Sequence, residues 1–213
     1  MNKARGLCIL DVDGTLIEEE VIDLLGKEAD CDKEVALITA QAMRGELDFE
    51  SSLKKRVSLL KGLSIDAFDK IYHELHLSKN AVQFIKTLKE SQIEVGLVSG
   101  GFTIIVEKLA KEFGIPLFVA NQLEISDGHL TGNLIGPVIS REVKEETLVS
   151  WANRLEVPLE CTIAVGDGAN DLKMLKRAGI GIGFCAKEIV KKEIPLQIDE
   201  RDLTKVLDKI NFL

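Results

Sequence analysis

Apolar residues along this chain follow two spacings that alternate over much of its length. Short apolar runs typical of buried strands are separated by segments in which apolar positions recur at helical spacing, such as Thr103–Phe113 and Glu142–Leu155. The strand-like runs are Leu7–Leu10, Ile93–Val98, Leu117–Val119, Thr162–Val165, Ile180–Ile182 and Leu196–Ile198. Alternation of strands and helices predicts an α/β fold in which helices cover both faces of a parallel sheet.

A block of helical periodicity separates the first predicted strand from the second. Between Thr15 and His76 the apolar positions keep helical spacing, with Gly45 and Gly62 as interruptions. The pattern predicts four helices with no strand among them. Because the block follows the first strand directly, we expect residues 16–76 to form a cap over the strand ends. Residues 1–15 and 77–213 would then form a Rossmann-like core.

A hairpin is predicted near the middle of the chain. The segments Leu123–Ser126 and His129–Leu134 have the pattern of strands, and they flank Asp127-Gly128. This dipeptide is a strong signal for a two-residue turn when strands lie on both sides of it. We therefore expect an antiparallel pair in addition to the parallel strands.

Composition and charge limit the partners of this chain. Of its 213 residues, 46 % are apolar and 29 % are charged, which is ordinary for a globular protein. The formal net charge of −8 disfavours nucleic acid as a partner, because such binding depends on clustered Lys and Arg. A phosphorylated small molecule is compatible with the charge, since local cations can bind it within an acidic protein.

The sequence also predicts a location. No apolar run approaches the roughly 20 residues of a membrane span, and the first strand begins too early for a signal peptide to precede it. The cysteines are widely separated and form no C-x-x-C motif: Cys8, Cys31, Cys161 and Cys185. We therefore expect reduced thiols in a cytoplasmic protein without a membrane partner, rather than a disulfide framework or a zinc site.

Paired acids follow the first predicted strand. Asp11 and Asp13 stand where that strand should end, before the turn-forming Gly14. In open α/β sheets, ligands bind at the carboxyl ends of the strands. Neighbouring carboxylates raise each other's pKa, so their pairing is costly unless a cation or a reaction requires it. The pair therefore indicates a metal-assisted nucleophile with an acid or base beside it.

The second predicted strand ends in Ser99-Gly100-Gly101. A hydroxyl and two unobstructed backbone N–H groups before a helix suit an anionic phosphate. The same three residues are also found in ordinary turns, so the motif alone does not decide between the two interpretations.

A second acid-rich loop follows the predicted strand Thr162–Val165. It contains Asp167, Asn170 and Asp171. Asp167 is a candidate ligand for a hard cation such as Mg²⁺, which prefers oxygen ligands. Helix capping explains one acid or the amide, but not why two loops at strand ends are both acid-rich. Lys144, on a predicted helix, would supply the fixed cation that several carboxylates and a phosphate require.

Two charged residues of the predicted cap are candidates for substrate binding. Arg56 lies beside an apolar stripe on a predicted helix from about Asp48 to Lys61, and it shares a face with Phe49. Its guanidinium either stays in water above a packed stem or points into the cleft and binds a carboxylate. Glu20 ends a run of three acids and is either a solvated helix start or a ligand. Met43 and Phe49 either wall the pocket or pack in the core.

The order of these motifs resembles the haloacid dehalogenase superfamily of phosphohydrolases. The motifs Asp-x-Asp-Gly-Thr, Ser-Gly-Gly, Lys and Gly-Asp-Gly-x-Asn-Asp occur in the superfamily's order and span nearly the whole chain. Other segments are similar to those of the members that hydrolyse phosphoserine: Met43–Glu50, Arg56–Leu60, Phe184–Lys187 and Arg201-Asp202-Leu203.

The resemblance implies a role for each motif residue. Asp11 would be the nucleophile and Asp13 the general acid and base, and both would bind Mg²⁺ together with Asp167, Asp13 through its backbone carbonyl. The phosphate would be bound by Ser99, Gly100, Lys144 and Asn170, with Gly101 and Asp171 in support. The substrate carboxylate would bind Arg56 and its ammonium Glu20, beside Met43 and Phe49.

The resemblance also implies the reaction. It is the Mg²⁺-dependent hydrolysis of O-phospho-L-serine to L-serine and phosphate through an aspartyl-phosphate, the last step of serine biosynthesis, by a monomer or homodimer. One alternative is a phosphatase or phosphotransferase for another small phosphomonoester, such as homoserine phosphate or a sugar phosphate. Another is a binding module that has kept the fold, although such a module would not need both acids of the first motif.

Overall fold

The computed structural model describes residues 4–43 and 46–210, and a single sheet lies at its centre. Within these residues seven strands run in the spatial order β4-β3-β2-β1-β5-β6-β7. Every neighbouring pair is parallel except β3 and β4. The strands are β1 (Gly6–Leu10), β2 (Ile93–Phe102), β3 (Leu117–Ser126), β4 (His129–Ile135), β5 (Thr162–Gly166), β6 (Ile180–Phe184) and β7 (Leu196–Ile198). The predicted α/β fold is confirmed.

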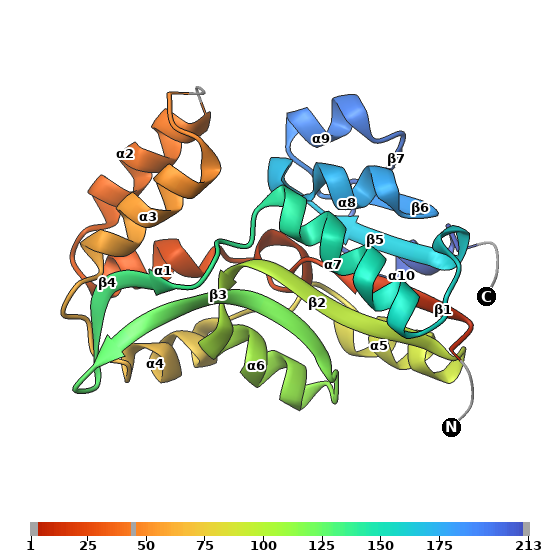
Figure 1. Cartoon of the computed structure of the whole chain (residues 1–213), viewed down its shortest axis with the longest axis horizontal. Helices are drawn as coiled ribbons and strands as arrows, with labels where there is room; N and C mark the ends of the chain where they lie inside the picture. The colour runs from red at the N-terminus through yellow and green to blue at the C-terminus, as the bar shows by residue number, and fades with distance from the viewer. Residues whose placement is uncertain (1–3, 44–45, 211–213) are drawn as a thin grey trace.

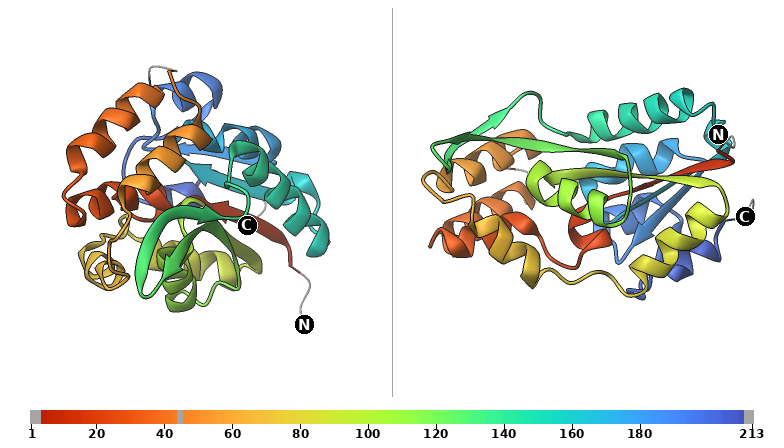
Figure 2. Two further views of the ribbon diagram at one scale, coloured as in Figure 1. Left: turned by 60° about the vertical axis from the view of Figure 1, so that its left-hand side comes forward. Right: turned by 90° about the horizontal axis from the view of Figure 1, so that it is seen from below.

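Helices cover both faces of the sheet because successive side chains of a strand point to opposite sides. On β1, Cys8 and Leu10 belong to one apolar cluster, and Leu7 and Ile9 belong to the other. The first cluster is covered by α5 (Ala81–Glu90), α6 (Thr103–Glu112) and α10 (Thr204–Leu207). The second is covered by α7 (Arg141–Arg154), α8 (Leu172–Arg177) and α9 (Glu188–Glu193). The right-hand view of Figure 2 shows α7 and α5 on opposite sides of the sheet.

The segment between β1 and α5 forms the predicted group of helices. These are α1 (Val21–Glu28), α2 (Asp32–Met43), α3 (Phe49–Leu59) and α4 (Ala67–Glu74). Figure 1 shows them together at one end of the molecule. The chain enters and leaves this group side by side, because Ile17 and Leu77 form an antiparallel bridge. A separate cap domain with boundaries at 16 and 76 stays a prediction.

The hairpin forms as predicted, but its first strand is longer than expected. Asp127 and Gly128 have φ angles of 51° and 75°, as a two-residue hairpin turn requires. The prediction of separate strands at Leu117–Val119 and Leu123–Ser126 was wrong, because β3 runs through both. Polar residues interrupt the apolar pattern where β3 changes partner from β2 to β4.

The tip of the hairpin contacts the helical group. The Gly62 N–H donates to the carbonyl of Leu130 at 2.8 Å, and the Leu130 N–H donates to the carbonyl of Leu63 at 2.9 Å. An added Cβ at Gly132 would lie 3.2 Å from the Ser58 carbonyl oxygen. The hairpin therefore supports the helices from the core side.

Two further differences from the sequence pattern concern the middle of the chain. Ser99-Gly100-Gly101 lies within β2, at a shift of register between Val98 and Phe102, and not in a turn. Helix α5 is an addition to the predicted elements. The four cysteines have free thiols in the structure. Among the described residues, no helix combines the length and apolar character needed to cross a membrane.

Candidate active site

Asp11 and its neighbours form a tight turn (η1, Val12–Leu16) directly after β1. Gly14 adopts a φ angle of 74°, a conformation that favours glycine. A Cβ at this position would lie 2.8 Å from Asp167 Oδ2. Since β1 and β5 are parallel neighbours, the loops that follow them meet at the same edge of the sheet. The two acid-rich loops predicted from the sequence are therefore adjacent.

Three carboxylates of these loops form one buried cluster. Asp11, Asp167 and Asp171 each offer an oxygen, and these oxygens lie within 4.8 Å of one another. Oxygen donors at this spacing fit a hard cation such as Mg²⁺. Asp11 and Asp167 are the ligands expected from the sequence, and Asp171, expected in support, lies beside them.

Lys144 lies inside this cluster of acids. Its side chain is 0 % exposed, and its Nζ donates to Asp11 Oδ1 at 2.5 Å and to Asp171 Oδ1 at 2.7 Å. The second oxygen of Asp171 accepts the Gly168 N–H at 2.9 Å. Desolvation lowers the pKa of Lys144, but the charges of Asp11 and Asp171 outweigh it and leave the pKa raised. Lys144 is therefore a permanent cation held against Asp11.

Desolvation and like charges raise the pKa values of the acids themselves. The pKa of Asp11 is well above its usual range, because of burial and the charge of Asp171, with Lys144 acting in the opposite direction. Desolvation and then the charge of Glu20 raise the pKa of Asp13 to about 8. Desolvation raises that of Asp167 to about 6, although Lys187 lowers it. A pKa near neutrality suits Asp13 to exchange protons.

The irregular end of β2, Ser99-Gly100-Gly101, where the register with β3 shifts, is supported by a residue that sequence reasoning missed; we call this segment the Ser99 loop. Asn121, on β3, donates from Nδ2 to the Gly100 carbonyl at 2.8 Å and accepts the Ile139 N–H at 2.9 Å. Within the loop, Ser99 Oγ accepts the Gly101 N–H at 2.8 Å. A single Asn in a strand carries no sequence signal for such a role.

The glycines of this loop let three other parts of the site approach. A Cβ at Gly100 would lie 3.2 Å from both Asn170 Nδ2 and Phe49 Cζ. A Cβ at Gly101 would lie 2.8 Å from Asp13 Oδ2. Asn170 and Asp13 thus come from neighbouring core loops, and Phe49 comes from α3. The predicted wall residue Phe49 does lie beside the predicted phosphate loop.

Glu20 and Arg56 lie on the side of the helical group. Glu20 precedes α1 and makes no capping bond with its side chain; its Oε1 lies 3.0 Å from Lys187 Nζ. Arg56 is half-buried and makes long hydrogen bonds to the Ser52 carbonyl (3.4 Å) and to Thr39 Oγ1 (3.5 Å). Desolvation lowers the pKa of Arg56, while the charge of Glu20 raises it. The side chain of Met43 lies outside the described residues.

Lys187 and Arg201 also reach the site, although the sequence gave them no individual role. Lys187 Nζ lies 3.2 Å from Asp167 Oδ2. Arg201 donates to the Gly14 carbonyl at 3.1 Å and to Ser78 Oγ at 3.3 Å, and its guanidinium lies over the Phe184 ring. Their segments were singled out only for their similarity to relatives.

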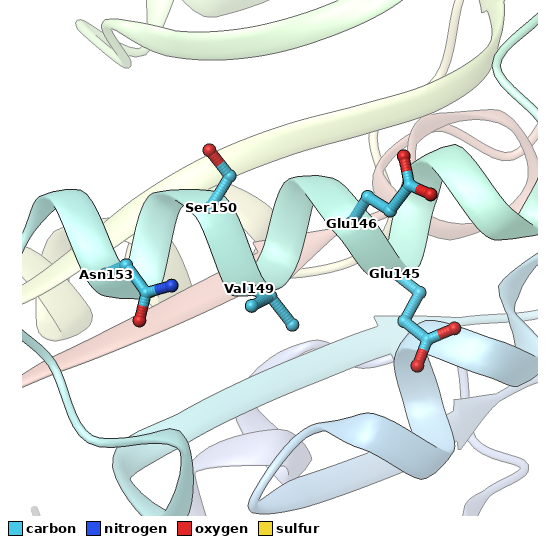
Figure 3. A pocket seen from close by; sticks show the side chains of 5 residues that line it. All are labelled: Glu145, Glu146, Val149, Ser150 and Asn153. Carbon is cyan, nitrogen blue, oxygen red and sulfur yellow. The ribbon is translucent and has the colours of Figure 1, made fainter.

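A separate hollow lies along the outer side of α7. Figure 3 shows its lining side chains: Glu145, Glu146, Val149, Ser150 and Asn153. None of these five is a candidate site residue, and Lys144, which directly precedes them, is buried on the other side of the helix. The hollow therefore belongs to the outer surface and not to the site.

Known proteins resemble this chain over its full length. Residues 6–179 match the family of haloacid dehalogenase-like hydrolases. The phosphoserine phosphatase of Streptococcus thermophilus is 51 % identical over 208 residues, covering 98 % of this chain and 97 % of the relative. That of Methanocaldococcus jannaschii is 43 % identical, covering 99 % of this chain and 100 % of the relative. A substrate-bound phosphoserine phosphatase structure has a TM-score of 0.93 at 42 % identity, covering 99 % of this chain and 100 % of its own.

Proposed function

The chain belongs to the haloacid dehalogenase-like hydrolase family, and we propose that it hydrolyses O-phospho-L-serine to L-serine and phosphate. The observation that carries the reaction is the buried contact of Lys144 with Asp11, which holds a carboxylate at the end of β1 beside the Ser99 loop. The substrate is supported by relatives of the same length that bear this activity. We propose that this reaction is the last step of serine biosynthesis, and we therefore assign it to the cytoplasm.

Asp11 is the nucleophile in this proposal. One of its carboxylate oxygens attacks phosphorus, the bond from phosphorus to the seryl oxygen breaks, and an aspartyl-phosphate forms. A solved structure of an analogue of this intermediate in a phosphoserine phosphatase has a TM-score of 0.92 with this chain at 43 % identity, covering 98 % of this chain and 100 % of its own. Lys144, the Ser99 hydroxyl and the N–H of Gly100 would stabilise negative charge on the phosphoryl oxygens.

Asp13 carries the proton in both steps. In its acid form it protonates the leaving seryl oxygen, so that neutral L-serine hydroxyl is released. It then takes a proton from the water that attacks phosphorus, and the bond to Asp11 breaks to regenerate the enzyme. Its raised pKa, about 8, keeps the proton available at neutral pH.

The donor set of the site fits Mg²⁺, the cation that phosphatases of this family generally use. Asp11, Asp167 and the backbone carbonyl of Asp13 would hold it, whereas both oxygens of Asp171 already accept bonds from Lys144 and Gly168. When bound, the ion neutralises charge on the phosphate and helps to orient it.

Residues 16–76 would bind the amino-acid part of the substrate as a cap. Arg56, whose present hydrogen bonds are long, would bind the carboxylate, and Glu20 would bind the ammonium. Phe49 would cover the phosphate beside Gly100 and exclude water from the reaction.

Phosphate release from phosphoserine by Asp11→Asn tests the nucleophile. We expect no turnover, an unchanged circular dichroism spectrum, and no acid-stable label on the protein after incubation with ³²P-phosphoserine. Wild-type protein, quenched in acid, should carry the label. Near-normal turnover by the variant would contradict the assignment.

Matched substrates test the assignment of the cap. O-phosphoethanolamine lacks only the carboxylate of phosphoserine, and 3-phosphohydroxypropionate lacks only the ammonium. Arg56→Ala should lower kcat/KM for phosphoserine about 10- to 150-fold and leave phosphoethanolamine nearly unchanged, because it removes a charge-assisted pair worth about 1.5–3 kcal/mol. Glu20→Gln should instead lower kcat/KM for phosphoserine and leave 3-phosphohydroxypropionate, which lacks the ammonium, nearly unchanged. Equal losses on all three substrates would mean that both residues are structural.

A further inference from the structure

Lys187 connects two parts of the site that are assigned to different ligands. Its Nζ lies 3.0 Å from Glu20 Oε1 and 3.2 Å from Asp167 Oδ2. In the proposed function Glu20 binds the substrate ammonium, and Asp167 binds the divalent cation. One protein ammonium therefore contacts both of the carboxylates that the two incoming cations require.

The backbone of Lys187 is fixed, but its side chain can move. The Lys187 N–H donates to the Asp167 carbonyl at 2.9 Å, just beyond the end of β6. The Lys187 side chain is 51 % exposed, whereas that of Asp167 is 10 % exposed. An ammonium on a flexible, half-exposed stem can return to water easily. Lys144, which is fully buried between two acids, lacks this freedom.

Lys187 is also the cation that Asp167 contacts most directly in the described part of the chain. Lys144 is engaged by Asp11 and Asp171, and Arg56 acts on Glu20 and Asp23. A divalent ion at Asp167 or an ammonium at Glu20 would stand next to Lys187 Nζ and repel it.

We propose that Lys187 is a displaceable counterion that couples binding of the divalent cation to binding of the substrate ammonium. Each ligand replaces one of the two contacts of Lys187, so the first ligand to bind weakens the hold on Lys187 and the second displaces it more easily. By linkage, each ligand raises the affinity of the other by the same factor. Both halves rest on the proposed function: the metal half takes Asp167 to hold the divalent cation, and the ammonium half takes the substrate to be an amino-acid phosphoester.

Calorimetric titration with Mg²⁺ tests the metal half without turnover. Lys187→Met removes the charge and keeps an unbranched stem. Lys191→Met is the matched control, because Lys191 lies on α9, the helix that Lys187 precedes as N-cap residue, and its Nζ pairs with Asp199 at 2.8 Å and with neither Glu20 nor Asp167. We expect Lys187→Met to bind Mg²⁺ about fivefold more tightly than wild type, and Lys191→Met to match wild type.

The ammonium half is tested with two phosphonates that cannot be hydrolysed. 2-Amino-4-phosphonobutyrate carries a methylene in place of the ester oxygen of phosphoserine, and 4-phosphonobutyrate also lacks the ammonium. The amino phosphonate should raise Mg²⁺ affinity in both proteins, and the factor of this increase should be about five times larger in wild type than in Lys187→Met. 4-Phosphonobutyrate should raise Mg²⁺ affinity by the same factor in both proteins, because only its phosphonate group interacts with the ion.

The outcomes separate this inference from the proposed function. Unchanged or weaker Mg²⁺ binding by Lys187→Met would overturn it and would mean that Lys187 holds Asp167 in place. Equal coupling by both phosphonates in wild type and variant would overturn the ammonium half. Failure of wild type to bind the amino phosphonate would contradict the proposed substrate and the ammonium half with it, while the Mg²⁺ titration would still decide the metal half.

Discussion

Replacing Lys144 with Met should destabilise the protein strongly, because it leaves two buried acids without their cation. Lys144 is 0 % exposed, and its Nζ contacts Asp11 at 2.5 Å and Asp171 at 2.7 Å, both of them buried. Met retains most of the apolar stem, so the loss measures the charge and not a cavity. Breaking a buried ion pair from one side costs about 3–5 kcal/mol.

This loss is large enough to measure by urea unfolding with a chelator present. For a chain of this length, about 3–5 kcal/mol corresponds to a fall in Tm of about 6–20 °C. Lys176→Met is the matched control, since Lys176 pairs with Glu193 at 2.8 Å but both side chains are about half exposed. An exposed pair contributes about 0–1 kcal/mol, so the free energy of unfolding should fall several-fold more in Lys144→Met than in Lys176→Met.

The loss should also depend on pH in a defined direction. Burial and Asp171 already raise the pKa of Asp11, and removal of Lys144 raises it further. Above the ordinary Asp pKa of about 4, the folded variant then binds more protons than the unfolded chain, so its stability falls as pH rises. The difference between wild type and variant should therefore shrink from pH 8 to pH 5.5.

Two results would refute this reasoning. One is a loss no larger than that of Lys176→Met, and the other is a loss that grows as the pH is lowered. If Lys144→Met alone does not fold, the double variant with Asp171→Asn removes one of the orphaned charges and should recover part of the stability. A double variant no more stable than the single one would contradict the charge argument.

Three further predictions concern the reaction, the sheet and the entry to the helical group. Asp13→Asn should lower kcat for phosphoserine about 10²–10⁴-fold. With p-nitrophenyl phosphate, whose leaving group needs no acid, the variant should keep the initial burst of p-nitrophenol while steady-state turnover falls, because the attacking water still needs a base; a variant that keeps wild-type kcat on phosphoserine would remove Asp13 from proton transfer. Gly181→Ala would place a Cβ 1.9 Å from the Leu175 carbonyl oxygen. The free energy of unfolding should therefore fall by about 3 kcal/mol, and an unchanged urea midpoint would contradict this expectation. The hydrogen bond that the His76 ring donates to the Glu19 carboxylate raises the pKa of His76, so its NMR titration midpoint should exceed about 6.5 and drop in Glu19→Gln. The stability that this pair adds is present below the unfolded pKa and is lost as pH rises through the folded one.

The sequence determined the fold class and most of the reacting groups. Apolar runs and helical spacing are local properties, so the alternation of strands and helices could be predicted without any contact between distant residues. The carboxyl ends of parallel strands share one edge of the sheet, which is why the loops at Asp11, Ser99 and Asp167 could be placed together. The hairpin turn at Asp127-Gly128 could also be predicted from the sequence, because it depends only on the φ angles of these two residues.

Tertiary structure decided what each of these groups touches. Lys144 meets Asp11 across 133 positions of sequence, and Lys187 meets Glu20 across 167. Asn121 supports the Ser99 loop only because β3 lies beside β2. Spacing along a chain carries no information on such contacts, since they arise when the sheet brings separate loops together. The pKa values of the acids follow from that same enclosure, because desolvation and the charges of distant residues exist only in the folded protein.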